Sequence, residues 1–166
     1  MQSVRKWLGI VTLAALCIME MIICAQYAPS YKLVWIYAML VICCILLDVF
    51  VALDYFVIKR PNLKFAAYGA DFFCLLVISI ITGNDFTVIL YCLATTEFYI
   101  SCEKFRLNLA IFGISAGVFV ASFVLGWVQL YQGESLYTSI VQILGGSLSG
   151  LIILAIHFVI SVALKR

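Results

Sequence analysis

The chain has 166 residues, of which 66% are apolar and 11% charged, and its net charge at neutral pH is +2. Soluble domains are typically about 45–50% apolar and about 25% charged, so this composition excludes a soluble globular domain, a disordered chain and a disulfide-stapled secreted module. It indicates an integral membrane protein with an all-α fold, because apolar runs of about 20 residues cross a bilayer as helices.

Polar residues divide the sequence into six long apolar stretches, each of which predicts a membrane-spanning helix. The stretches are continuously apolar, whereas the strands of a membrane barrel alternate. Turn-forming residues such as Pro29, Pro61 and Gly83 stand between them. We therefore predict one helical-bundle domain over residues 1–166. Its expected spans are 7–26, 33–58, 65–82, 86–102, 107–130 and 136–164.

The basic residues predict the orientation of these spans. Of the ten Lys and Arg residues in the chain, only Lys32 lies in a loop on the side opposite the others. Membrane proteins keep the loops that are rich in Lys and Arg in the cytoplasm. We therefore expect a polytopic protein with six transmembrane helices and both termini in the cytoplasm.

The first span begins after basic residues, as a signal peptide does, but it lacks a small-x-small cleavage site and contains Glu20. We expect a retained helix. Glu20 falls in the outer half of the bilayer, where it could form an outer-leaflet site with Tyr31 and Trp35 for a cationic or amphipathic ligand. The alternative is a single Glu that is protonated or that reaches the interface.

Four ionisable residues in later spans fall toward the cytoplasmic leaflet, namely Asp48, Asp71, Glu97 and His157. A charge within a span costs at least about 2.5–3.5 kcal/mol on insertion scales, so each of these residues is expected to have a structural or functional role. Brought together, the four would form a buried polar cluster that could sense pH, relay protons or bind a cation. The alternative is a structural hydrogen-bond network between helices. Asp54, nearer the cytoplasmic surface, is expected to be solvated.

The sequence contains no H-E-x-x-H and no Walker loop. Residues 113–117 match G-x-S-x-G by letter, but they lie inside a long apolar stretch and not at a strand-to-helix turn, where that motif is catalytic. Its seven cysteines lie within or at the edges of spans and form no C-x-x-C pair. We expect these cysteines to act as small hydrophobic side chains, and we predict no catalytic residue, metal or cofactor.

Small residues recur in the last two spans. The fifth carries Gly113 and Gly117, and the sixth carries Gly146 and Gly150, each pair four residues apart. This spacing lets two helix backbones approach closely. We expect tight helix contacts at both pairs, within the chain or across a homodimer, and we favour contacts within the chain for the fifth span.

The sixth span is longer than the roughly 20 residues that a bilayer needs. It runs to Leu164 and is followed by Lys165 and Arg166, with no Gly, Asn or Pro to stop the helix. We expect such a helix to continue into a cytoplasmic coiled coil. The chain would then be the membrane domain of a longer protein.

Residues 88–101 read VILYCLATTEFYIS, in which a Leu-Tyr pair is followed by an apolar turn and then by Glu97 in a small and polar setting. A basic loop and a glycine-containing span come next. From the third span to the sixth, the chain resembles the membrane sensor region of bacterial DesK-like (NarL-type) sensor histidine kinases. The resemblance implies a homodimeric signal-input domain in the bacterial plasma membrane. Its last helix would act through a kinase region outside this chain on a response regulator.

Three functions remain open at this stage. The leading hypothesis is a sensor module in which a stimulus in the bilayer changes helix packing in the last two spans and moves the end of the sixth. The alternative is a small transporter or the substrate-binding subunit of a vitamin importer, with the acids and His157 lining its site. The third is an envelope factor without chemistry of its own. The expected partners are lipid and a second copy, and not nucleic acid.

Overall fold

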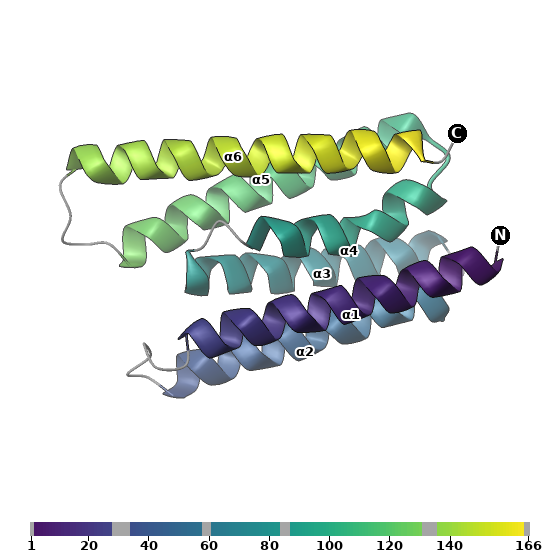
Figure 1. The fold of residues 1–166 in the computed structure, drawn as a ribbon, viewed down its shortest axis with the longest axis horizontal. Coiled ribbons are helices and arrows are strands. Elements are labelled where there is room, and N and C mark those ends of the chain that lie inside the picture. The colour runs from purple at the N-terminus through teal and green to yellow at the C-terminus, as the bar shows by residue number, and fades with distance from the viewer. Residues whose placement is uncertain (1, 28–33, 58–60, 84–86, 131–135, 165–166) are drawn as a thin grey trace. The chain divides into compact units, whose positions relative to one another are not determined.

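Helices make up nearly all of the chain that the structure describes. The structure is a computed structural model, and it describes residues 2–27, 34–57, 61–83, 87–130 and 136–164. Within these ranges the chain forms six helices and no strand, so the predicted all-α fold is confirmed. Figure 1 shows the helices, which are α1 (Gln2–Tyr27), α2 (Val34–Phe56), α3 (Pro61–Thr82), α4 (Thr87–Ser101), α5 (Phe105–Leu130) and α6 (Leu136–Ala163).

The bounds of the helices follow local sequence signals. Helices α1 and α3 start earlier than the predicted apolar spans, because polar residues can continue a helix beyond its apolar part. Helix α3 begins at Pro61, since proline suits the first helical position, where no N–H is needed. It ends before Gly83, whose φ of 55° is the left-handed conformation that commonly terminates a helix. The N–H of Gly83 donates to the Ser79 carbonyl at 2.8 Å.

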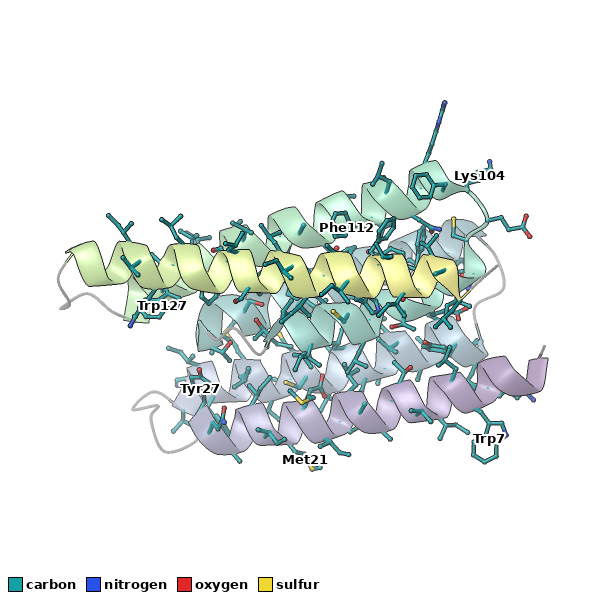
Figure 2. All side chains as sticks on the ribbon, turned by 45° about the horizontal axis from the view of Figure 1, so that its top comes forward. Trp7, Met21, Tyr27, Lys104, Phe112 and Trp127 are labelled. Carbon is teal, nitrogen blue, oxygen red and sulfur yellow. The ribbon has the colours of Figure 1, made fainter. Side chains whose placement is uncertain are left out.

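Four of the helices are long and apolar enough to cross a membrane, so the chain is a membrane protein. Their apolar parts are Lys6–Tyr27, Val34–Phe56, Phe105–Trp127 and Ile140–Ala163. In α3 and α4 the corresponding apolar parts are shorter, Ala66–Thr82 and Thr87–Ser101. Large side chains such as Trp7 and Met21 point outward from α1 (Figure 2) and are 67% and 64% exposed. An apolar outer surface of this kind is expected where lipid surrounds the helices.

The helices belong to two compact units, Met1–Ile78 and Ser79–Arg166. In the first unit, α1 packs along α2. Leu16 of α1 and Leu47 of α2 are completely buried there. Gly9 allows α1 to lie close to α2, since a Cβ at this position would come within 2.9 Å of the Tyr55 ring. The first unit is therefore organised around a close pair of long helices.

In the second unit, α6 packs against both α4 and α5, and α4 also contacts α5. Aromatic rings fill the space between these helices. The Tyr99 and Phe158 rings meet edge to face with their centroids 5.3 Å apart, and Phe112 lies 5.1 Å from Phe158. Deeper in the unit, Tyr91 meets Phe119 edge to face at 5.8 Å. Edge-to-face aromatic pairs add about 0.5–1.5 kcal/mol beyond the area that they bury.

Glycine allows close approach at two places in the second unit. Gly150 of α6 lies directly against the Phe119 ring, which leaves no room for a Cβ. At Gly126 of α5, a Cβ would meet the Gly83 Cα at 2.8 Å. Gly113 and Gly117 are exposed instead, and a Cβ at either would meet no described atom within 4 Å. The close approach of α5 that we expected at those two glycines therefore occurs at Gly126 within this chain.

Candidate functional site

Asp48 of α2 faces α1 in the first unit. The Cys17 thiol donates a hydrogen bond to Asp48 Oδ2 over 3.1 Å. The carboxyl group of Glu20, one turn along α1, lies close enough to Asp48 for the two carboxyl groups to interact. Glu20 and Asp48 therefore lie between α1 and α2, the two longest helices of the first unit.

This pairing differs from the sequence-based prediction, which placed Glu20 alone in the outer half of the bilayer and Asp48 in the inner half. Depth was predicted by counting residues from the loops. The count assumes that neighbouring helices start level, but the stagger of one helix along another is set by side-chain packing.

The predicted outer-leaflet site is not assembled among the described residues. Glu20 is only 5% exposed, whereas the Trp35 ring is 81% exposed on the surface of α2. Tyr31 lies outside the residues that the structure describes. The exposure of Trp35 at the start of α2 matches the belt of aromatic side chains that membrane proteins place at the lipid–water interface.

Asp54 is buried, contrary to the expectation that it is solvated. It is 2% exposed, and its Oδ2 accepts a hydrogen bond from the Tyr68 hydroxyl. Its Oδ1 lies 3.6 Å from Lys64 Nζ. Lys64 and Tyr68 are four residues apart on α3, so they share one face of that helix. That face turns toward α2 and removes Asp54 from solvent.

Asp71 is the least satisfied acid in the described part of the chain. It is 2% exposed, and neither of its carboxyl oxygens has a hydrogen-bond partner there. Asp71 lies one turn beyond Tyr68, the hydrogen-bond donor to Asp54, on α3. Among the described residues, no group of three or more His, Cys, Asp or Glu side chains could hold a metal ion.

His157 of α6 forms a polar contact with α4 in the second unit. Its Nε2 lies 3.0 Å from Thr96 Oγ1 and 3.2 Å from Ser161 Oγ. The Thr96 hydroxyl has one proton, which it donates to the Cys92 carbonyl at 2.8 Å. Thr96 must then accept from His157, which assigns the proton to Nε2. His157 Nδ1 is left as a buried acceptor without a hydrogen-bond partner.

Glu97, the other predicted member of the polar cluster in the second unit, is 1% exposed. It follows Thr96 on α4, and consecutive side chains on a helix point about 100° apart. Thr96 is the α4 residue whose hydrogen bond to His157 is seen. Thr96 was not among the predicted site residues, because a threonine carries no charge and its polar contact depends on which helix lies opposite.

A second polar contact in this unit was also missed. The Tyr91 hydroxyl lies 3.5 Å from Ser79 Oγ and 3.4 Å from Ser122 Oγ. These three buried residues join the last turns of α3 to α4 and α5. Tyr91 was treated as part of a sequence pattern, and only the packed structure shows that its hydroxyl needs these partners.

Comparison with known proteins adds no assignment, since no protein family, curated protein or solved structure matches this chain. The resemblance of residues 88–101 to DesK-like sensors stays a prediction. The contacts of His157 and the buried acids are therefore the basis for a functional proposal.

The hydrogen bond between His157 and Thr96 is expected to couple α4 to α6. We predict that His157→Phe and Thr96→Val each lower the free energy of unfolding. The double variant is expected to lower it by less than the sum of the two single losses. Hydrogen bonds between membrane helices average about 0.6 kcal/mol, with a maximum near 1.7 kcal/mol. Unfolding titrations of the four proteins in mixed micelles measure this coupling. Strictly additive losses would show that the two side chains do not interact.

Proposed function

We propose that the chain is the membrane sensor domain of a bacterial histidine kinase of the DesK-like type, working as a homodimer in the plasma membrane. Six spans with both termini in the cytoplasm form the domain. A stimulus in the bilayer changes how α6 packs on α4 and α5, and α6 passes that change to a kinase region and then to a response regulator.

The contact that carries this proposal is the one between His157, Thr96 and Ser161. His157 lies six residues before Ala163, the last residue of α6, so it is about 9 Å from the helix end at 1.5 Å per residue. A hydrogen bond can break and re-form without leaving a cavity, unlike an aromatic contact. Such a contact suits a helix that alternates between two positions whose free energies differ by a few kcal/mol.

The positions of basic residues support the six-span arrangement. Lys64 lies in the first turns of α3, and Lys104 and Arg106 lie at the junction of α4 and α5. If α3 and α4 cross the membrane, these residues share one side, as the positive-inside rule requires. Helix α4 has 15 residues, or about 22 Å at 1.5 Å per residue, so it would need a locally thinner bilayer.

The first test is the gene sequence downstream of the codon for Arg166. The proposal expects a heptad-patterned helix, a phosphotransfer segment with histidine and an ATP-binding domain. With that protein in hand, autophosphorylation in lipid nanodiscs is compared for wild type, Gly150→Leu and Gly117→Leu. Gly150→Leu is expected to lock the activity in one state, because Gly150 contacts Phe119, while Gly117→Leu serves as the control. A stop codon after Arg166 would contradict the proposal.

A small transporter is the second candidate, and Asp71 is the observation that favours it. A buried acid without hydrogen-bond partners at membrane depth often marks an ion pathway. In proteoliposomes that contain the purified chain, an imposed proton or sodium gradient would then acidify the vesicle interior or drive sodium into it. Asp71→Asn would abolish this flux. Flux that is unchanged in Asp71→Asn would exclude this role for Asp71.

A further inference from the structure

One face of α3 carries a polar row, formed by Lys64, Tyr68 and Asp71, that ends inside the helix. These residues are spaced by four and then three positions, so they share one face. Lys64 Nζ lies 3.6 Å from Asp54 Oδ1, and the Tyr68 hydroxyl donates a hydrogen bond to Asp54 Oδ2. The first two members of the polar row are therefore tied to α2, and Asp71 lies one turn further along α3.

Asp54 and Asp71 are equally buried but differ in their partners. Each is 2% exposed. Asp54 has an ammonium group and a hydroxyl donor beside it, whereas both oxygens of Asp71 lack a hydrogen-bond partner among the described residues. An ionised carboxylate that is buried without a partner is so costly that the group takes up a proton instead. These surroundings keep Asp54 ionised and Asp71 neutral.

The ligand that suits Asp71 is a proton. A hard metal cation such as Mg²⁺ or Ca²⁺ needs about six or more oxygen ligands at once. In the described ranges, no group of three or more His, Cys, Asp or Glu side chains could hold a metal ion. A proton needs one oxygen: a hydronium ion gives its proton to an Asp71 oxygen, one O–H bond forms there, and water leaves.

The surroundings of Asp71 differ between the two directions along α3. Toward Lys64 the face is polar, and the Lys64 side chain is 15% exposed. In the other direction the same face continues with Leu75 and Ile78, which are apolar and completely buried. Proton relays within membranes run through polar side chains, and the polar row supplies such side chains on the Lys64 side.

We propose that Asp71 is a proton-binding site that exchanges its proton with solvent along the polar row, through the end at Lys64. The assignment of that end to the cytoplasm rests on the proposed six-span arrangement. The site does not depend on the sensor role. It limits the second candidate function, because a site that is open at one end binds a proton without carrying it across the membrane.

Infrared difference spectroscopy of the full chain in lipid nanodiscs tests the bound proton. A protonated carboxyl group has a carbonyl stretching band that an ionised carboxylate lacks. At neutral pH, Asp71→Asn is expected to lose one such band relative to wild type. Asp54→Asn is the matched control, since Asp54 is equally buried and contacts the same face of α3, and it is expected to keep the band. No loss in Asp71→Asn, or the same loss in Asp54→Asn, would overturn the proposal.

Exchange of the proton for deuterium tests the path. In D₂O the Asp71 band shifts as its O–H bond becomes O–D, and the time course gives the exchange rate. Tyr68→Phe removes the hydroxyl of the polar row and is expected to slow this exchange while the band remains. Tyr91→Phe makes the same chemical change in the second unit and is expected to exchange as wild type does. Equal rates in Tyr68→Phe and wild type would exclude a path along the polar row.

Sodium and flux measurements separate proton binding from transport. Sodium chloride added to the wild-type chain at constant pH is expected to leave the Asp71 band in place, and loss of the band would identify a sodium site instead. In proteoliposomes, a bound proton without proton flux would support the proposal and exclude the transport candidate. Proton flux that is lost in Asp71→Asn would show that the path opens at both ends, which contradicts a site open at one end.

Discussion

Gly126→Leu is expected to be among the most destabilising single substitutions in the described part of the chain. A Cβ at this position would lie 2.8 Å from the Gly83 Cα and 2.9 Å from the Ser79 carbonyl oxygen. Both are backbone atoms, so no side chain can rotate to make room. Overpacking a core typically costs about 1–3 kcal/mol, and a leucine forced against backbone should reach the upper end of that range.

The measurement is the free energy of unfolding in mixed micelles of increasing SDS content, followed by circular dichroism. Gly117→Leu is the matched control, since it lies on the same helix and a Cβ there meets no described atom within 4 Å. We expect Gly117→Leu to unfold nearly as wild type does. Equal losses in the two variants would show that α5 does not approach the end of α3 at Gly126.

Lys64→Met is expected to destabilise the first unit by about 3 kcal/mol, because breaking a buried ion pair leaves a charge without compensation. Asp54 would keep the hydrogen bond from Tyr68 but lose the ammonium group 3.6 Å from its Oδ1. The Lys64 side chain is 15% exposed, so some solvent screens the pair. The expected loss is therefore at the lower end of the range of about 3–5 kcal/mol for buried pairs.

The same micelle titration measures this loss, and the double variant Lys64→Met with Asp54→Leu is its control. Replacing both partners of a buried ion pair with apolar groups is often neutral or stabilising. The double variant should therefore recover much of the stability that Lys64→Met loses. A single variant as stable as wild type, or a double variant less stable than the single one, would contradict a buried pair between Lys64 and Asp54.

The glycines show what residue spacing cannot predict, namely which face of a helix makes the close contact. Gly113 and Gly117 have the spacing of a helix-packing motif, yet they are exposed, while Gly126, with no glycine four residues away, makes the close contact. Spacing predicts only that small residues share one face of a helix. Which face turns inward depends on all side chains along the helix, and here the rings of Phe119 and Phe123 occupy the interior.

The acids show the same limit for polar residues. Glu20 and Asp48 were predicted at different depths, and they lie close enough to interact because α1 and α2 pack together. A position along the chain gives no direct measure of the stagger between two helices.

The sequence by itself determined that this protein is helical, that it belongs in a membrane and where its helices end. These properties are local: an apolar run of sufficient length must satisfy its own backbone hydrogen bonds in lipid, and Gly83 ends α3 through its own φ. Only the tertiary structure decided that His157 meets Thr96 and that Asp54 meets Tyr68. Those contacts depend on the rotation and stagger of whole helices, which many weak packing interactions set together.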